Sequence, residues 1–439
     1  MAVIIDTEQQ LQDLVGRDLL ICPIPEDDRT HPHNTRIIAF AFMDVVSKHT
    51  YIASVAHPEA LFHIDSLDFI TGKTYGTNIA LLKSNGYEVD VDIDMAYYLT
   101  HNKGFSLEVD PMVRHYGRTF PQCTKTNALI DLYKLEDRVA EIYYKYFTTK
   151  LPPGLEFYSK KLKNTFIGIE GNGLKVDIDK FKESFGSTFS LHNDFSYTQY
   201  NYYTTTGRPS NRFDGVNYAA LPKDDSTREC FISRYGSDGC LLELDFNSYH
   251  PRIIASIIGY DFKEENVYEH LAKHYHNTDN PTKEQMSKAK EDTFRQIYGG
   301  IRRDYLGIPF FAMIDSFVDT LWNHMKKHGY IDSPLSGRRL NFSSYKELTP
   351  FTLFNYFIQM TETEYNTNIL IKLNENISAN KLKTVPVMYT YDSVLFDVPN
   401  DEVDTLVSKV IPNSIDLYKF PIKIKSGKDY ANLTVTGKR

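Results

Sequence analysis

The chain has 439 residues, of which 41% are hydrophobic and 24% are charged. This length allows several domains with a sizeable core, and no apolar run reaches the roughly 20 residues of a membrane-spanning helix. The net charge of −8 argues mildly against a large nucleic-acid-binding surface, although a local basic cleft would suffice. The four cysteines lack metal-site spacing and the N-terminus lacks a signal-peptide pattern, so we expect a soluble, reduced, cytoplasmic protein.

Residues 1–150 carry the signals of a first α/β unit. Thr7 and Gln10 have the spacing of a capping box, which predicts a short helix. Apolar runs rich in β-branched and aromatic residues predict three strands after it. These strands are expected over 19–24, 36–42 and near 50–53.

The stretch 241–260 places one carboxylate at the end of an apolar run. Leucines within 241–244 precede Asp245, and the apolar residues over 253–258 have the spacing of a buried helix. Asp245 is therefore expected where a core strand gives way to a helix. Such an Asp is often a helix N-cap, and a charge at this position needs a partner, so the pattern leaves both a capping and a ligand role open.

A helix is predicted over 283–300, with four residues on one face because they are spaced by seven, four and four positions. This face consists of Lys283, Lys290, Phe294 and Tyr298. The pattern is compatible with an amphipathic helix that has solvated lysines and core aromatics. It also suits a nucleotide, with charge for the phosphates and rings for the sugar and base.

A second carboxylate, Asp392, lies between the apolar runs 385–388 and 394–396. This pattern predicts a hairpin of two strands with Asp392 at or near its tip. Asp is common in tight turns, so a purely structural role is open here too. Two carboxylates on rigid β elements, Asp245 and Asp392, also suit hard divalent cations such as Mg²⁺, which take oxygen ligands.

Together these segments resemble motifs A, B and C of the family A (Klenow-like) DNA polymerases. Motif A is matched by DFNSYHPR at 245–252, motif B by the Lys290, Phe294 and Tyr298 spacing, and motif C by YDS at 391–393. Three further segments match in the family's order. They are TTTGRPS at 204–210 followed by VN at 216–217, GY and GRR within 329–339, and NYFIQ at 355–359.

The resemblance implies an α/β multi-domain fold. An N-terminal 3′–5′ exonuclease-like (RNase H-like) α/β domain would precede a right-hand polymerase, built from a palm with an antiparallel sheet, helical fingers and a short thumb. A last strand near 418–424 would lead to a polar tail. The expected boundaries are 1–150 for the exonuclease-like domain, 151–203 for the thumb, 204–260 for the palm with motif A, 261–340 for the fingers with motif B, and 341–439 for the palm with motif C and the C-terminus.

The exonuclease chemistry is expected to be lost. An active domain needs Asp-x-Glu on its first strand, which 20–25 does not contain, and Leu82 stands where the second motif has Asp. Without these ligands the metals cannot be held, so Asp92 and Asp137 are expected to be ordinary surface acids and the domain a scaffold.

By resemblance, the chain would be a template-directed DNA-dependent DNA polymerase that adds dNTPs to a primer 3′ end by a two-metal mechanism. Asp245, Asp392 and the carbonyl of Phe246 would hold two Mg²⁺ ions, with Mn²⁺ as a substitute. Lys290, assisted by Lys283, would neutralise the triphosphate. Phe294 would lie near the sugar and Tyr298 by the templating pair.

Primer–template DNA is the second partner that the resemblance implies. Its backbone and minor groove would be contacted near the active site, where A·T and G·C pairs look alike. The residues expected to bind DNA are Arg208, Asn217, Arg252, Asn355 and Gln359. The short thumb predicts low processivity unless a processivity or replisome partner holds the complex on DNA.

The chain departs from the family pattern at three positions. His250 stands where motif A usually has the Glu that blocks a ribose 2′-hydroxyl, Met286 replaces an Arg of motif B, and Ser393 replaces a Glu of motif C. Imidazole is bulky enough to act as the gate but lacks the hydrogen-bonding capacity of a carboxylate. His250 as a core or metal histidine is the alternative.

Two other functions stay open at this point. A single-subunit RNA polymerase shares motifs A, B and C, but the short interval between Asp245 and Asp392 argues against it. A non-catalytic DNA-binding replication scaffold would explain the departures, but not the joint presence of Asp245, Asp392, Lys290 and Tyr298. The compact build would suit a phage or other mobile replicon, which would place the protein in the host cytoplasm.

Overall fold

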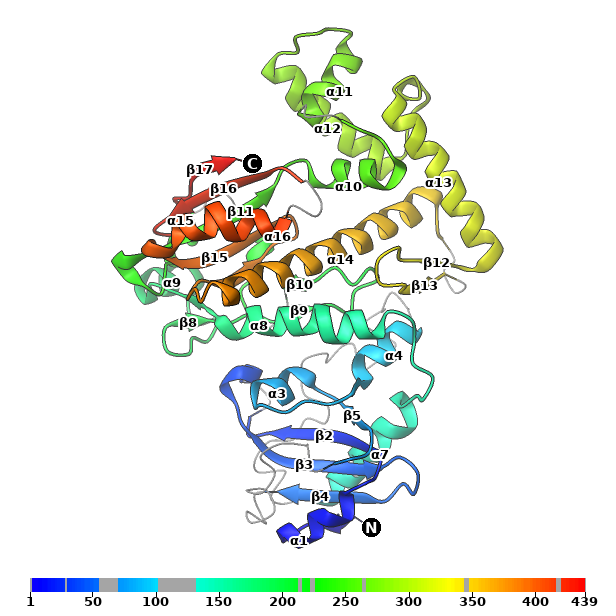
Figure 1. Ribbon diagram of the computed structural model, residues 1–439, viewed down its shortest axis with the longest axis vertical. Coiled ribbons are helices and arrows are strands. Elements are labelled where there is room, and N and C mark those ends of the chain that lie inside the picture. The colour runs from blue at the N-terminus through cyan, green and yellow to red at the C-terminus, as the bar shows by residue number, and fades with distance from the viewer. Residues whose placement is uncertain are drawn as a thin grey trace.

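The computed structural model describes residues 2–27, 30–54, 70–101, 132–211, 215–221, 226–262, 266–342, 347–415 and 420–438. Figure 1 shows an N-terminal α/β unit at one end and a larger body of sheet and helices in the middle. At the other end of the molecule lie helices α11 (Val267–His276), α12 (Lys283–Gly299) and α13 (Pro309–His328). No helix in the described part of the chain has the length and apolar character needed to cross a bilayer.

A mixed sheet forms the centre of the N-terminal unit, with the described strands in the order β1-β4-β3-β2-β5-β6. The central strands are almost wholly buried because helices and loops cover the sheet, which is why they read as continuous apolar runs. The three strands expected at 19–24, 36–42 and 50–53 are present. The bounds are β1 (Val3–Ile4), β2 (Leu19–Pro25), β3 (Ile37–Asp44), β4 (Thr50–Ser54), β5 (Thr74–Gly76) and β6 (Val91–Asp92).

The helices of this unit begin with the short helix that the capping box predicted. The backbone N–H of Thr7 donates to Oε1 of Gln10 at 3.1 Å. The bounds are α1 (Glu8–Leu11), η1 (Gln12–Leu14), η2 (Pro32–Asn34), α3 (Ile79–Ser84), α4 (Ile93–His101) and α7 (Leu132–Tyr146).

Asp92 is not the surface acid that the sequence predicted. It is only 4% exposed, and its Oδ2 lies 2.7 Å from Nζ of Lys163, which is 1% exposed. Lys163 comes from the segment that follows the unit, so a pattern within 1–150 gave no sign of the pairing. Asp137 is exposed, as expected.

The segment after the N-terminal unit begins with a continuous helical stretch, because η3 (Phe157–Lys163) runs directly into α8 (Asn164–Asn172). Helix α8 packs against strand β14 (Val385–Tyr389) of the main sheet. Short elements follow, paired as β7 with β8 and β9 with β10. The bounds are η3 (Phe157–Lys163), α8 (Asn164–Asn172), β7 (Leu174–Lys175), α9 (Ile178–Phe185), β8 (Phe195–Ser196), β9 (Tyr200–Asn201), β10 (Ser210–Asn211), η4 (Tyr218–Ala220), η5 (Ser226–Cys230) and η6 (Gly236–Asp238).

The main sheet is antiparallel, with the described strands in the order β14-β15-β11-β16-β17. The predicted strand before Asp245 and the predicted hairpin around Asp392 are both present. The strand expected near 418–424 corresponds to β16, but it is not the last strand, because 434–438 in the polar tail forms a further strand on β16. Residues 418–419 lie outside the described residues. The bounds are β11 (Gly239–Phe246), β14 (Val385–Tyr389), β15 (Ser393–Pro399), β16 (Ile422–Gly427) and β17 (Thr434–Lys438).

Helix α14 (Pro350–Ala379) runs through the middle of the body in Figure 1, beside the main sheet and α8. Its central stretch is buried although it contains acids, amides and hydroxyls, so these polar groups need partners inside the protein. The remaining elements are α10 (Tyr249–Ile258), η7 (Arg303–Tyr305), β12 (Tyr330–Asp332), β13 (Arg339–Asn341), η8 (Asn400–Glu402), α15 (Val403–Thr405), η9 (Leu406–Val410) and α16 (Ile411–Ile415).

Candidate active site

Two acidic residues that are far apart in the sequence lie at the same end of neighbouring interior strands of the main sheet. Asp245 lies near the end of β11, and Asp392 lies in the turn between β14 and β15. The pairing of β11 with β15 sets Asp245 opposite Ser393. The backbone N–H of Phe246 donates to the carbonyl oxygen of Asp392 at 2.9 Å. The antiparallel register therefore makes the two predicted acids neighbours.

Helix α14 contacts the turn that carries Asp392 through the side chain of Asn366. The amide Nδ2 of Asn366 donates to the carbonyl of Tyr391 and to the hydroxyl of Tyr389, each at 2.8 Å. Tyr391 has a φ of +62°, a left-handed conformation that is uncommon for a residue other than glycine. Contacts from Asn366 thus fix a backbone conformation that this turn would otherwise adopt rarely.

Lys425 on β16 places an internal cation beside the first carboxylate. Its Nζ lies 2.9 Å from Oδ2 of Asp245 and 2.5 Å from Oε2 of Glu243. Burial alone would lower the pKa of Lys425, but hydrogen bonds to Glu243 and Asp245 outweigh burial and raise the pKa. The ammonium group therefore stays charged and offsets one of the two negative charges of Glu243 and Asp245.

The donor set around these acids fits a cation that is shared with a substrate. No cluster of three or more acid, histidine or cysteine side chains that could hold a metal occurs among the described residues. Mg²⁺ does not need such a cage, because it commonly binds one or two carboxylates together with waters and substrate phosphates. Asp245 and Asp392 provide such carboxylates, and Phe246 at the end of β11 carries the carbonyl that the motif resemblance adds.

One face of α12 carries the predicted nucleotide-binding residues, and α11 contributes a further ring. The rings of Phe294 and Tyr298 are stacked, with centroids 5.7 Å apart. Nζ of Lys290 lies 5.8 Å from the ring centroid of Tyr268 on α11, and Tyr268 lies 6.4 Å from Phe294. Lys283 is exposed at the first residue of α12. The helix thus presents a cation and a ladder of rings on one side.

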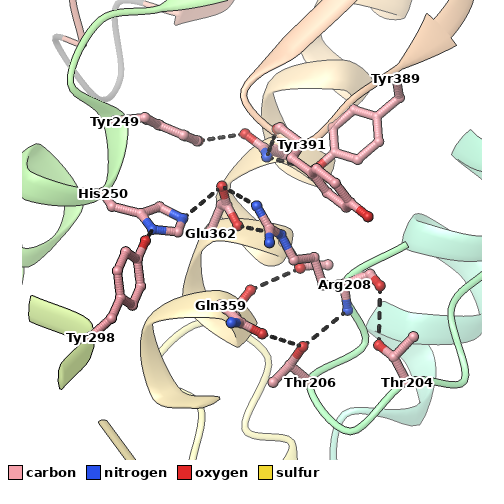
Figure 2. A network of polar contacts seen from close by, with 12 residues as sticks. Thr204, Thr206, Arg208, Tyr249, His250, Tyr298, Gln359, Glu362, Tyr389 and Tyr391 are labelled. Carbon is pink, nitrogen blue, oxygen red and sulfur yellow. Dashed lines mark hydrogen bonds and ion pairs between the residues drawn. The ribbon is translucent and has the colours of Figure 1, made fainter. Parts of the chain in front are cut away.

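Glu362 on α14 contacts residues from two other segments, and each of these residues contacts one more, as Figure 2 shows. Its Oε1 lies 2.9 Å from Nε2 of His250, and its Oε2 lies 2.9 Å from Nε of Arg208. Nδ1 of His250 contacts the hydroxyl of Tyr298. The guanidinium of Arg208 stacks over the ring of Tyr391, 3.8 Å from its centroid. These contacts link motifs A, B and C with the 204–210 segment.

The charges in this network shift the pKa values of Glu362 and Tyr298. Burial alone would raise the pKa of the Glu362 carboxyl, but the contacts with His250 and Arg208 outweigh burial and lower the pKa. Burial, followed by the nearby Glu362 charge, raises the pKa of the Tyr298 hydroxyl. Glu362 is therefore an anion at neutral pH, and Tyr298 keeps its proton.

The residues predicted to bind DNA lie in different surroundings. Nδ2 of Asn355 donates to the carbonyl of Tyr298 at 3.2 Å, and Oε1 of Gln359 accepts from the Thr206 hydroxyl at 3.4 Å. Asn217 is exposed just before η4. Arg252 is half-buried on α10, and this burial lowers the pKa of its guanidinium.

Four residues of the site were missed by sequence reasoning: Glu362, Asn366, Lys425 and Tyr268. The run MTETEYN within α14 did contain a signal, because two acids close together between apolar runs need partners if the helix is buried. The alternation IKIK over 422–425 also put its lysines on one face of a strand. Neither pattern identified the residues that these acids and lysines would contact.

Comparisons with known proteins agree with this architecture. No protein-family model matches the chain. Among solved structures, the chain is similar to the POL domain of Pol1 from M. smegmatis in a complex with DNA primer-template and dNTP. The TM-score is 0.70, the match covers 98% of this chain and 99% of that one, and the sequence identity is 14%. The chain therefore has the fold of a DNA polymerase domain, which the sequence motifs predicted.

Proposed function

We propose that the chain is a template-directed DNA-dependent DNA polymerase that adds dNTPs to the 3′ end of a primer. The observation that carries this proposal is that Asp245 and Asp392 lie at adjoining strand ends. The similar fold of the M. smegmatis domain, whose complex contains primer-template and dNTP, supports the same function. We therefore take primer–template DNA and dNTPs as the partners of this chain.

Asp245 and Asp392, with the carbonyl of Phe246, would hold two Mg²⁺ ions, for which Mn²⁺ would substitute. Ions at such a site neutralise charge on the attacking and leaving oxygens of an in-line displacement. In the free protein, Lys425 neutralises Asp245 and orients its carboxylate. Because the side chain of Asp245 is 31% exposed, an incoming ligand can reach it.

The other residues of the site position the substrates and compensate their charge, since phosphoryl transfer requires little covalent chemistry from the protein. Lys290, which is exposed on α12, binds the triphosphate and gives a proton to the leaving pyrophosphate, and Lys283 assists it. Phe294 packs by the sugar and Tyr298 by the templating pair. The primer–template is bound by Arg208, Asn217, Arg252, Asn355 and Gln359.

We assign the parts of the molecule as follows. Residues 1–150 are an exonuclease-like domain that serves as a scaffold, because its Asp92 is bound to Lys163 instead of being available to a metal. Residues 151–203 are a short thumb, 261–340 the fingers, and 204–260 with 341–439 the palm. Within the described residues 174–203 the one helix is α9, which has eight residues, and this supports the short thumb.

The direct test is primer extension on a defined template with Mg²⁺. The wild-type chain is expected to extend the primer in the order that the template dictates. Asp392→Ala should reduce extension to the background of the assay while DNA binding persists, and Asp401→Ala, which changes an exposed acid in η8, should behave as wild type. Normal extension by Asp392→Ala would refute the assignment of the site.

A non-catalytic DNA-binding scaffold is the second candidate function. The contact between Lys425 and Asp245 favours it, because an internal ammonium group sits on a carboxylate that catalysis needs. Under this function, the wild-type chain binds primer–template DNA but incorporates no nucleotide with either Mg²⁺ or Mn²⁺. The same extension assay, run with a DNA-binding measurement, separates the two candidates.

A further inference from the structure

The carboxylate that motif A lacks is present in the structure, but it comes from a different helix. The resemblance to family A places a Glu at the position of His250. In the folded chain, Glu362 of α14 lies directly behind that histidine, with 2.9 Å between Oε1 and Nε2. The side chain of Glu362 is fully buried, and that of His250 nearly so. An acid–imidazole pair thus occupies the place where a single acid was expected.

The charge of Glu362 biases the tautomer of the imidazole. An ionised carboxylate lies 2.9 Å from Nε2 of His250, and this negative charge favours a proton on that nitrogen. In the neutral imidazole, Nδ1 is then an acceptor, and the hydroxyl of Tyr298 donates to it. Glu362 therefore favours one tautomer of the imidazole, whose other nitrogen contacts Tyr298 on α12.

The same carboxylate also holds a cation on its other side. Nε of Arg208 lies 2.9 Å from Oε2 of Glu362, and the guanidinium covers the ring of Tyr391, the residue before Asp392. A buried acid with two such partners is strongly coupled to both, since removal of one member leaves charge uncompensated. A change at Glu362 should therefore be felt at His250 and at Arg208 together.

We infer that Glu362 is a positioning residue that fixes His250 and Arg208 and thereby sets the discrimination between deoxyribose and ribose in the incoming nucleotide. This inference rests on the proposed polymerase function. Glu362 itself need not touch the nucleotide. His250 presents the steric block, and Glu362 supplies the charge and the fixed orientation that an imidazole alone lacks.

The first test compares Glu362→Gln with Glu364→Gln. Glu364 is a matched control because it is equally buried on the same helix but accepts hydrogen bonds from Ser336 and Tyr158 on another side. The readout is the ratio of kcat/KM for a dNTP to kcat/KM for the matching ribonucleotide. A loss of folded protein changes both values equally, so a purely structural role does not move this ratio.

For Glu362→Gln we expect the ratio to fall by about tenfold, because the negative charge that fixes His250 and Arg208 is removed. For Glu364→Gln we expect the wild-type ratio. If both variants keep the wild-type ratio while the wild-type chain extends primers, the inference is overturned and the proposed function stands.

The second test moves the carboxylate back to motif A. The single change His250→Glu puts two acids against each other in a buried site, so it should impair incorporation of both sugars. The combination of His250→Glu with Glu362→Ala removes that repulsion and leaves one acid facing Tyr298. We expect the combination to recover most of the wild-type ratio, and a combination worse than either single change would overturn the inference.

If the wild-type chain extends no primer, nucleotide binding is measured in place of incorporation. A primer–template ending in a dideoxynucleotide allows a dNTP and a ribonucleotide to compete for the site without chemistry. A lower preference for the dNTP in Glu362→Gln than in Glu364→Gln supports the inference. Binding of neither nucleotide to the wild-type chain overturns both the inference and the proposed function.

Discussion

The N-terminal unit and the main sheet each contain an acid paired with a lysine, but the two pairs differ in their contact with solvent. Asp92 and Lys163 are 4% and 1% exposed, with 2.7 Å between their charged atoms. Asp245 and Lys425 are 31% and 22% exposed, with 2.9 Å between theirs. The geometry of the contact is nearly the same in both regions, so exposure is what separates them.

This difference in exposure agrees with the roles proposed for the two acids, Asp92 in structure and Asp245 in cation binding. A buried pair that loses one member leaves a charge in a medium of low dielectric, so Lys163 and Asp92 hold the N-terminal unit against η3 and α8. A partly exposed pair is screened and exchanges its partner more easily. Asp245 can therefore accept another cation, while Asp92 is closed to one.

The largest expected effect is on the buried pair. Lys163→Met should lower the free energy of unfolding by about 3–5 kcal/mol, because Asp92 would be left buried without its partner. The measurement is denaturant-induced unfolding followed by circular dichroism. Lys163→Met combined with Asp92→Asn removes both charges and should regain a large part of the loss. Equal stability of Lys163→Met and wild type would contradict the structural role of this pair.

Substitution of Lys425 in the partly exposed pair should change cation binding more than it changes stability. Lys425→Met is expected to lower the free energy of unfolding by about 1–2 kcal/mol, since Glu243 and Asp245 lose a partner that is only partly buried. It should also lower the Mg²⁺ concentration for half-maximal primer extension about tenfold, because a competing positive charge is removed. Lys428→Met, at an exposed lysine, serves as the control. An unchanged Mg²⁺ requirement in Lys425→Met would break the comparison.

The elements around the site could be predicted because their patterns are local. The apolar run before Asp245, the hairpin around Asp392 and the helix with Lys290, Phe294 and Tyr298 each follow from residues within about twenty positions. The order of these segments along the chain was enough to indicate the polymerase fold, which the likeness to the M. smegmatis domain then supported.

The partners of charged residues could not be predicted because they come from distant parts of the chain. Lys425 and Asp245 are 180 positions apart, and Lys163 and Asp92 are 71 positions apart. Glu362 and Arg208, which are in contact, are 154 positions apart. A single sequence shows that a buried acid needs a partner, but three-dimensional packing decides which residue provides it.

The smallest expected effect sharpens the comparison inside the N-terminal unit. Burial raises the pKa of Asp94 to about 6, with Lys163 lowering it and Asp92 raising it. An acid with a higher pKa in the folded than in the unfolded chain stabilises the fold below the unfolded pKa of about 4, and this contribution is lost as the pH rises from about 4 to about 6. Oδ1 of Asp94 also has no hydrogen-bond partner among the described residues.

Asp94→Asn should therefore raise the free energy of unfolding by about 1–2 kcal/mol at pH 7 and by much less at pH 4. Unfolding in denaturant at the two pH values measures the difference. Asp137→Asn, at an exposed acid, should leave stability unchanged at both. A benefit of Asp94→Asn that is the same at pH 4 and pH 7 would contradict the raised pKa.

The most direct measurement is the binding of Mn²⁺ to the protein in a complex with a dideoxy-terminated primer–template and a dNTP, with free Mn²⁺ followed by its electron paramagnetic resonance signal. The wild-type chain and Asp401→Ala are expected to take up Mn²⁺ equally. Asp245→Ala and Asp392→Ala should each lose most of that uptake, since the two carboxylates act as one site. Wild-type uptake of Mn²⁺ by Asp392→Ala would contradict the conclusion that these acids hold the divalent cations.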